Sequence, residues 1–316
     1  MQTNDRRGNE RTVVPRADPA MPFRELARAK VNLTLTVLGR RCDGYHDITS
    51  LVTFADVGDR VTLRPGADRQ VRVYGSFASA IEGPNLLDRA LDLLWALQPD
   101  LQLGVVELEK ALPVAAGLGG GSADAAALLR AVRRANPAHA ATIDWHNLAA
   151  RLGADVPVCL AGKPAVMTGV GDRVEPLAPS HALPPLACVL VNPRVPLPTQ
   201  RVFAALDASA DPALQQHAHH KEGSGAEGAV LFDVEALLTH MRNRGNDLEP
   251  AATSLLPVIA EIKAALAAQP GCRIAAMSGS GPTCFGIFAN DEAAQGARRA
   301  IARAHPPWWV HSTRLG

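Results

Sequence analysis

The sequence has few aromatic residues, almost no net charge and few cysteines. Phe, Trp and Tyr make up 4% of the 316 residues, so few side chains could stack on a planar ligand. A formal net charge of +1 points to no nucleic-acid or anionic-membrane partner and favours a small metabolite. The five cysteines, at positions 42, 159, 188, 272 and 284, form no C-x-x-C pair. This spacing argues against a disulfide framework or a zinc site and favours a reducing cytoplasm.

Long apolar runs are also missing. No stretch is long enough to span a bilayer, and the N-terminus lacks the apolar core of a secretory signal. Residues 1–20 alternate Arg with acidic residues and are predicted to be a disordered arm. At 316 residues and 47% hydrophobic content, two domains sharing a cleft are expected, residues 21–165 and 166–316. We therefore expect a cytoplasmic monomer or homodimer with no membrane or nucleic-acid partner.

The apolar pattern predicts a mixed fold. Alternation over residues 27–38 indicates a half-buried strand, with Lys30 and Asn32 together on the face away from the core. Further strands are expected at 52–54, 60–63, 71–74, 104–109, 164–167, 187–191, 273–277 and 283–288, and helices at 85–97, 122–134, 145–152 and 255–266. Strands and helices mix without strict alternation and without an internal repeat, which favours an α+β fold over a doubly wound sheet.

A glycine-rich loop lies between a predicted strand and a predicted helix. It comprises Pro113, Val114, Ala115, Ala116, Gly117, Leu118, Gly119, Gly120 and Gly121, followed by Ser122 and Ala123. Glycines let the backbone approach a ligand closely, and the free N–H groups of the following helix attract anions, so the loop is suited to nucleotide phosphates.

Neither common phosphate-loop pattern fits this segment. No lysine precedes Ser122, as Walker A requires, and the dinucleotide fingerprint lacks its last glycine. The loop could instead be a plain turn. Ser122 could cap the helix, present its hydroxyl to a metal–phosphate group, or do both.

The loop resembles the second motif of the GHMP kinases, named for the galacto-, homoserine, mevalonate and phosphomevalonate kinases. Their third motif, a C-terminal glycine loop, is similar to the segment Ser278, Gly279, Ser280, Gly281, Pro282 and Thr283, and their first motif to residues 29–33. The three motifs keep their order and spacing over most of residues 24–290. The resemblance implies a two-domain α+β fold with its active site in the interdomain cleft. It also implies that ATP lies with its triphosphate against residues 113–123, and that residues 278–283 close the site.

One stretch narrows the choice within the GHMP kinases. Lys30-x-Asn32, continued by Arg40 and by Asp43-Gly-Tyr-His46, is similar to the start of those members that act in the non-mevalonate isoprenoid pathway on a cytidyl-linked methylerythritol. Residues 152–157 and 169–172 match the same members. The resemblance implies phosphorylation of the 2-hydroxyl of that acceptor. Residues 114–116 carry less glycine than many members, and residues 206–228 contain no motif. Another acceptor, such as homoserine or mevalonate, and a non-catalytic ATP-binding regulator are the alternatives.

The resemblance also assigns roles to single residues. Asp155 is expected to be the catalytic base; the alternative is an N-cap, because Val156-Pro157 can open a helix. Lys30 would keep Asp155 ionised and steady charge on the transferring group; otherwise it is a solvated strand lysine. Asn32 would orient the acceptor. Mg²⁺ would bridge the phosphates with help from Ser122, and Asp124 could contribute through water.

The cytidyl group needs an aromatic platform and polar groups that read its edge. By resemblance Tyr45 stacks on the base, His46 bonds its edge, Phe203 forms the second face and Thr199 lies in the same substrate site. Otherwise Tyr45 is a packed loop residue and Phe203 a core residue of a helix. His217, His219 and His220 lack a second group of ligands, so no metal site is expected there.

Overall fold

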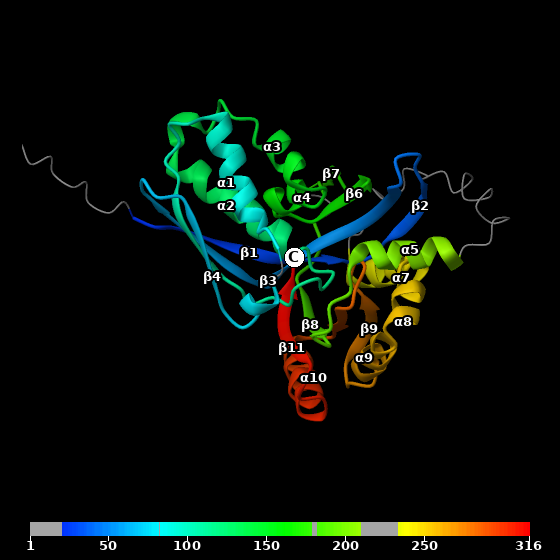
Figure 1. Ribbon diagram of the computed structural model, residues 1–316. Coiled ribbons are helices and arrows are strands. Elements are labelled where there is room, and N and C mark those ends of the chain that lie inside the picture. The colour runs from blue at the N-terminus through cyan, green and yellow to red at the C-terminus, as the bar shows by residue number, and fades with distance from the viewer. Residues whose placement is uncertain (1–20, 82, 179–181, 210–232) are drawn as a thin grey trace, which may run out of the picture.

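The computed structural model describes residues 21–81, 83–178, 182–209 and 233–316. In this part of the chain eleven strands form one sheet, with helices packed against it (Figure 1). The strands are β1 (Phe23–Asn32), β2 (Thr36–Arg40), β3 (His46–Pro65), β4 (Gln70–Tyr74), β5 (Gly104–Glu109), β6 (Ala165–Gly169), β7 (Arg173–Pro176), β8 (Leu186–Asn192), β9 (Cys272–Met277), β10 (Cys284–Phe288) and β11 (Trp309–Leu315). The helices are α1 (Leu86–Leu97), α2 (Gly120–Ala135), α3 (Trp145–Leu152), α4 (Val156–Ala161), α5 (Thr199–Ser209), α7 (Val234–Arg244), α8 (Glu249–Leu255), α9 (Val258–Ala267) and α10 (Asp291–Ala304), with 3₁₀ turns η1 (Ala78–Ala80) and η2 (Pro137–His139). The predicted arm and the three histidines lie outside the described residues.

The long strand β3 organises the sheet. It pairs with β1, β2, β5, β6 and β11, so the prediction of two separate short strands at 52–54 and 60–63 was wrong. The apolar pattern breaks at Gly58, yet the backbone continues through it. A Cβ at Gly58 would lie 2.2 Å from the carbonyl oxygen of Ala27. The glycine therefore lets β1 approach closely, which is why the strand persists where its pattern stops.

The predicted strand over residues 27–38 is also interrupted. The N–H groups of Leu33 and Thr34 both donate to the carbonyl of Leu51, so the regular ladder with β3 ends there. Leu35 then pairs instead with the loop after α7, where it donates to Gly245 O and accepts from the N–H of Asp247. The chain resumes pairing with β3 only in β2. This exchange of partners ties the end of β1 to the C-terminal half.

The N-terminal half packs around α2. This helix contacts β1, β3, α1, α3 and α4, and its buried residues surround most of its circumference, as expected of a core helix. Small side chains such as Ala125 and Ala126 keep it close to β1, while Leu128, Leu129 and Val132 fill the first hydrophobic core. In Figure 1 α1 and α2 lie above β3 and β4.

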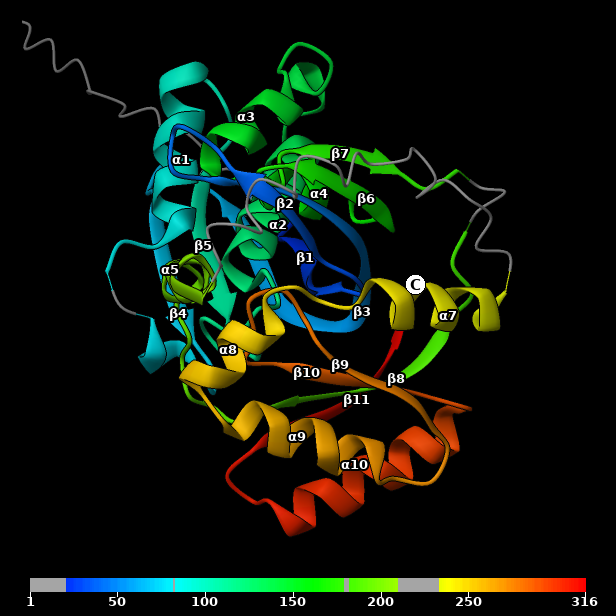
Figure 2. The same ribbon diagram turned by 90° about the vertical axis from the view of Figure 1, so that its right-hand side faces the viewer.

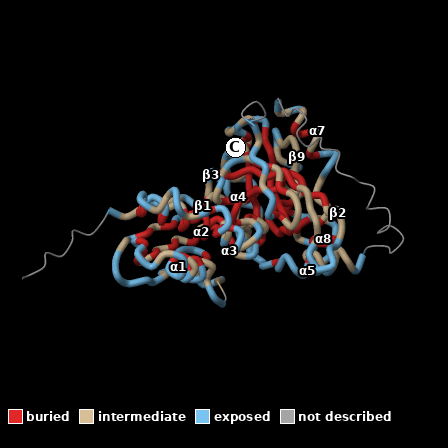
Figure 3. The backbone as a smooth tube through the Cα atoms, turned by 90° about the horizontal axis from the view of Figure 1, so that it is seen from above, coloured by how far each residue is buried: buried red, intermediate tan, exposed pale blue. Residues whose placement is uncertain are grey.

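The C-terminal half packs α9 and α10 onto β8, β9, β10 and β11, as Figure 2 shows. Val189, Val191, Ile259 and Ile262 belong to its core. A further hydrophobic cluster joins the halves, because residues of β1 pack with residues of β8 and β10. Figure 3 shows buried backbone running through both halves and between them. The division at residues 165 and 166 stays a prediction.

The predicted helix over 255–266 is two helices. The break falls at Leu256-Pro257, where proline has no N–H to donate into a continuous helix.

The sequence pattern gave no expectation for β7, α7, α10 or β11. No single helix in the described part of the chain is long and apolar enough to cross a membrane; α8 and α9 meet that criterion only as a pair, and they are bent by 119°.

Candidate active site

A cleft of about 920 Å³ lies between the two halves and gathers most of the predicted residues. Its walls come from β1, the loop 113–121, the start of α2, the turn before β3, α5 and the C-terminal glycine loop. Of the predicted residues, those lining it are Lys30, Asn32, Tyr45, His46, Pro113, Val114, Ala115, Ala116, Gly117, Gly119, Gly120, Gly121, Ser122, Asp155, Thr199, Phe203, Gly279 and Ser280. The side chains of Leu118 and Ala123 are instead buried in the core.

The start of α2 presents unpaired backbone donors to this cleft. The first helical hydrogen bond runs from the N–H of Ala123 to Gly119 O at 2.8 Å. The N–H groups of Gly120, Gly121 and Ser122 therefore have no acceptor within the helix. Together with the positive end of the helix dipole, they form a site for an anion.

Two glycines of the loop are required by its geometry. Gly117 has φ of 71°, and a Cβ there would lie 2.4 Å from Ser278 O. Gly119 has φ of 62°, and a Cβ there would lie 3.3 Å from Lys30 side-chain atoms. By contrast, a Cβ at Gly121 would meet nothing within 4 Å, so that position faces open cleft.

Helix α2 begins at Gly120, two residues earlier than predicted. Its N-cap is Gly119, which has left-handed backbone and no side chain to cap with. The interpretation of Ser122 as the N-cap is therefore wrong, since Ser122 is the third residue of the helix. Its side chain lines the cleft, which leaves the hydroxyl for a ligand.

The C-terminal glycine loop, residues 278–283, supports the first loop from behind. Ser278 Oγ donates to Gly117 O at 3.0 Å and accepts from the N–H of Asn32 at 3.1 Å. The N–H of Thr283 donates to Ala116 O at 3.2 Å. Gly279 and Ser280 reach the cleft, whereas Ser278 is buried. This loop thus fixes β1 and the first glycine loop relative to each other.

Lys30 and Asp155 form an ion pair across the cleft floor. Lys30 Nζ lies 2.8 Å from Asp155 Oδ1, and the two side chains are 6% and 35% exposed. Asp155 occupies the N-cap position of α4, but its side chain makes no capping hydrogen bond. The geometry thus favours the pairing role over the cap. Lys30 is not a solvated lysine, because its side chain is buried. Its main-chain N–H donates to Leu118 O, which places it directly beside the glycine loop.

Asn32 lies one strand repeat beyond Lys30 on the same face of β1. Its Nδ2 donates to Ser50 Oγ at 2.7 Å, and Ser50 Oγ in turn donates to Thr34 O. These bonds fix the amide plane and use one of the two N–H donors of Nδ2. Asn32 Oδ1 is then the atom that an acceptor hydroxyl could reach from the cleft.

Tyr45, His46 and Phe203 line the same cleft, and two of them are in ring contact. Tyr45 is 65% exposed at a turn in which its N–H bonds Asp43 Oδ1. His46 stacks on Phe203 with ring centroids 4.7 Å apart and an angle of 22° between planes. Thr199 Oγ1 lies 2.8 Å from Ser280 Oγ, which links α5 to the C-terminal loop. The expected roles are compatible with this placement, although His46 itself covers one face of Phe203.

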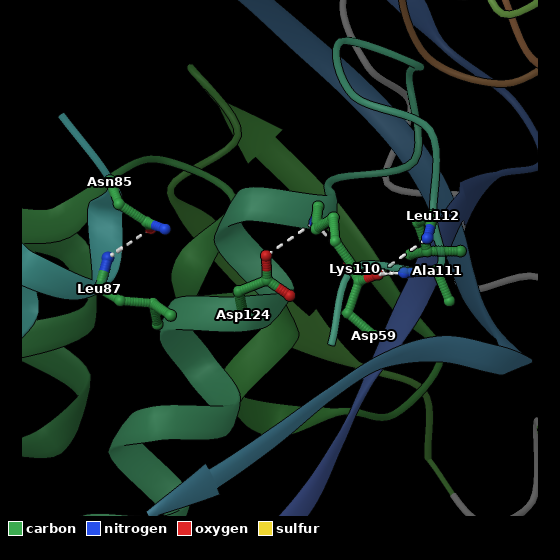
Figure 4. Close-up of polar contacts among 7 residues, drawn as sticks. All are labelled: Asp59, Asn85, Leu87, Lys110, Ala111, Leu112 and Asp124. Atoms are coloured by element: carbon green, nitrogen blue, oxygen red, sulfur yellow. Dashed lines mark hydrogen bonds and ion pairs between the residues drawn. The ribbon is translucent and has the colours of Figure 1, made fainter. Parts of the chain in front are cut away.

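A buried ionic cluster that the sequence did not predict lies behind the first glycine loop (Figure 4). Lys110 Nζ lies 2.5 Å from Asp59 Oδ2 and 2.7 Å from Asp124 Oδ2. Asp59 Oδ1 also accepts the N–H groups of Ala111 at 2.6 Å and Leu112 at 2.8 Å. The cluster therefore holds both ends of the loop, the strand that enters it and the helix that leaves it.

Burial and charge act in opposite directions on Asp124 and Lys110. It raises the pKa of Asp124 to about 7, because the attraction of Lys110 offsets only part of it and Asp59 adds repulsion. Burial lowers the pKa of Lys110, but Asp124 and Asp59 raise it by more, so the net shift is upward. Asp124 Oδ1 has no hydrogen-bond partner. Asp59 gave no clear signal in the sequence, because β3 also carries Asp56, Arg60 and Arg64.

Comparisons with known proteins decide the family. The family model described as GHMP kinases N terminal domain matches residues 85–163, and the one described as GHMP kinases C terminal matches residues 226–307. A 4-diphosphocytidyl-2-C-methyl-D-erythritol kinase of Rhodopseudomonas palustris (strain HaA2) is 46% identical over 301 residues, covering 94% of this chain and 99% of that protein. The chain belongs to the GHMP kinases, in the 4-diphosphocytidyl-2-C-methyl-D-erythritol kinase family. The predicted family and kinase class are confirmed, and ATP is the cosubstrate of this GHMP kinase.

Solved structures confirm the fold of the GHMP kinase. A crystal structure of 4-(cytidine 5'-diphospho)-2C-methyl-D-erythritol kinase has a TM-score of 0.70 at 33% identity, covering 93% of this chain and 99% of that one. Homoserine kinase from Cytophaga hutchinsonii has a TM-score of 0.68 at 20% identity, covering 92% and 94%, which shows the fold alone. The α+β prediction is therefore confirmed, whereas the roles of single residues stay predictions.

One more cleft residue of this GHMP kinase was not predicted. Asn85 caps α1 by accepting the N–H of Leu87 on its Oδ1 at 3.0 Å, while its buried Nδ2 has no hydrogen-bond partner. Ile81, Pro84 and Leu86 surround it in the wall of the cleft. An amide donor in apolar surroundings suits a planar polar ligand. The sequence indicated Asn85 only as a helix start.

Removing Lys110 should destabilise the kinase strongly. Lys110→Met leaves Asp59 and Asp124 buried without their counter-ion, so we expect the free energy of unfolding to fall by about 3–5 kcal/mol. The matched control is Arg60→Met, whose pair with Glu109 has side chains 71% and 35% exposed; its loss should stay below about 1 kcal/mol. Urea denaturation measures both. Equal losses in the two variants would contradict a role of the cluster in holding the loop.

Proposed function

We propose that this kinase transfers the γ-phosphoryl group of ATP to the 2-hydroxyl of 4-diphosphocytidyl-2-C-methyl-D-erythritol, a step of the non-mevalonate isoprenoid pathway. The observation that carries the proposal is the Lys30–Asp155 pair, 2.8 Å apart, beside an anion site at the start of α2. A base, a cation and a phosphate cradle in one cleft are the requirements of phosphoryl transfer. The name of relatives 44–47% identical supports the acceptor.

The donor phosphates would rest on the start of α2. The N–H groups of Gly120, Gly121 and Ser122 face the cleft and would bond phosphate oxygens. ATP's purine would then extend toward Asn85, whose unpaired Nδ2 is a donor for a ring or ribose acceptor. The apolar wall around Asn85 would cover the faces of the base.

The residues present fit a magnesium ion held mainly by phosphates. Ser122 and Asp124, two residues apart at the start of α2, both line the cleft, and Asp124 Oδ1 has no hydrogen-bond partner. The described residues contain no group of three or more His, Cys, Asp or Glu side chains that could hold a metal, and Mg²⁺ usually keeps water with few protein ligands. When bound, the ion neutralises charge on the transferring phosphates. Ser122 would contact it directly and Asp124 through water.

Asp155 would accept the proton of the acceptor hydroxyl as its oxygen attacks the γ-phosphorus. Lys30 favours the ionised carboxylate and would stabilise negative charge on the transferring group. Asn32 Oδ1, held by the bond of its amide to Ser50, would fix the hydroxyl's orientation. Because the pair sits on the floor of the cleft, the hydroxyl must enter between it and the phosphates.

The cytidyl end of the acceptor would lie between β2 and α5. Tyr45 is exposed there and would stack on the base, while His46 would bond its edge and Phe203 would complete the aromatic wall. Thr199 would contact the diphosphate or ribose. A net charge of +1 supports a small-molecule partner over a nucleic acid or an anionic membrane. A cytoplasmic monomer or homodimer is part of the same proposal.

Acceptor choice tests the proposed function. With ATP and Mg²⁺, ADP should appear only when diphosphocytidyl methylerythritol is present, and ³¹P and ¹³C NMR should locate the new phosphate on the 2-hydroxyl. Chelation of Mg²⁺ should stop the reaction, and added Mg²⁺ should restore it. ADP release with homoserine or mevalonate, and none with the cytidyl acceptor, would overturn the assignment.

Gly121→Val tests the phosphate cradle without disturbing its supports. Because a Cβ there meets no protein atom within 4 Å, the side chain enters only the space meant for phosphate. ATP affinity measured by calorimetry should fall about tenfold or more, since each 1.4 kcal/mol lost is a factor of ten. The control is Gly296→Val in α10, where a Cβ also meets nothing within 4 Å. Unchanged ATP affinity in Gly121→Val would mean that the loop is only a turn.

A further inference from the structure

Asp207 is a cleft residue that no motif indicated. It lies on α5 four residues after Phe203, so both side chains are on one face of that helix. That face meets His46: Phe203 stacks on the imidazole ring, and Asp207 Oδ1 lies 2.7 Å from His46 Nε2. The side chains of His46 and Asp207 are 7% and 29% exposed. The stacking contact with Phe203 therefore fixes the plane of the His46 ring, and the contact with Asp207 fixes the position of its Nε2.

The carboxylate determines which ring nitrogen carries a proton. An ionised Asp207 can only accept hydrogen bonds, so at 2.7 Å the Nε2 of His46 must be the donor. Arg40 Nη1, 3.6 Å from Asp207 Oδ2, keeps a positive charge beside that carboxylate. In the neutral ring the other nitrogen, Nδ1, is then left with a lone pair and can only accept. The ring is held in one tautomer by a residue that need not touch the substrate.

We propose that Asp207 is a positioning residue that sets the base specificity of this kinase through His46. Cytosine and uracil differ in that cytosine carries an amino donor where uracil carries a carbonyl acceptor. An accepting Nδ1 matches the amino group of cytosine and faces the uracil carbonyl with two acceptors and no proton between them. The inference rests on the proposed function, since it takes the cytidyl group to be read by His46.

A protonated or inverted ring would not discriminate in this way. If Nδ1 carried a proton it would donate, and the uracil carbonyl could accept that bond. Discrimination thus depends on the acceptor-only character of Asp207. Asparagine at this position can accept or donate, so it removes the constraint on the tautomer while keeping nearly the same shape.

The test compares Asp207→Asn with the wild-type kinase on cytidyl and uridyl acceptors. We expect the ratio of kcat/KM values, cytidyl over uridyl, to fall about tenfold, the value of roughly one hydrogen bond. The loss should lie in the KM of the cytidyl acceptor, with kcat at saturation and the KM of ATP nearly unchanged. The matched control is Asp47→Asn, which makes the same change next to His46 on a carboxylate that lies 3.4 Å from Arg41 instead; its ratio should equal the wild-type ratio.

Long-range ¹⁵N NMR of His46 gives an independent measurement, and its wild-type spectrum does not depend on whether a variant folds. We expect a neutral ring protonated on Nε2 in the wild type at slightly alkaline pH, and a mixture of tautomers in Asp207→Asn. A wild-type ring protonated on Nδ1 or on both nitrogens would overturn the proposal, as would an unchanged ratio in Asp207→Asn. No turnover of the cytidyl acceptor by the wild type would instead refute the proposed function itself.

Discussion

The ion pair between Lys30 and Asp155 is the interaction on which the site depends. It joins β1 to the start of α4 at 2.8 Å, and it occupies the carboxylate that would otherwise cap that helix. A helix of six residues gives up a capping bond worth about 1 kcal/mol to keep its aspartate free for this pair. The missing cap thus falls on the residue that we propose as the base, and local rules are commonly broken at functional sites.

The contacts around this pair hold the glycine loop in a fixed position next to it. The main-chain N–H of Lys30 donates to Leu118 O at 2.9 Å, which holds the loop against β1. On the other side of the loop, Ser278 and Thr283 donate hydrogen bonds to its backbone carbonyls. Lys110 and Asp59 fasten its ends from the core side. A preorganised cradle is what catalysis by charge stabilisation requires, since donors that must reorganise during the reaction lose their advantage. The C-terminal half therefore completes a site whose chemical groups belong mainly to the N-terminal half.

The sequence predicted those parts of the site that are built from residues close together in the chain. The strand–loop–helix arrangement around the first glycine loop was recognisable because glycine density and apolar periodicity are properties of neighbouring residues. The start of α2 was misplaced because the left-handed Gly119, not Ser122, ends the loop. Lys110 and Asp59 are 51 residues apart, and Asp207 meets a histidine 161 residues away. Such pairs follow from the sheet register and helix packing, which no short window of sequence contains. The roles of Lys30 and Asp155 came from resemblance, and the structure adds the distance that makes them plausible partners.

The central claim is that Asp155 accepts a proton and is not a helix cap. Asp155→Asn separates these roles, because asparagine caps a helix about as well as aspartate but is a poor base. We expect kcat to fall by about 10²–10⁴ with ATP affinity nearly unchanged, while the free energy of unfolding falls because the buried Lys30 side chain loses its counter-ion. Asp144→Asn is the control, since Asp144 does cap α3 by accepting the N–H of Asn147 at 2.9 Å; its kcat should match the wild type. A folded Asp155→Asn kinase with wild-type kcat would contradict the account.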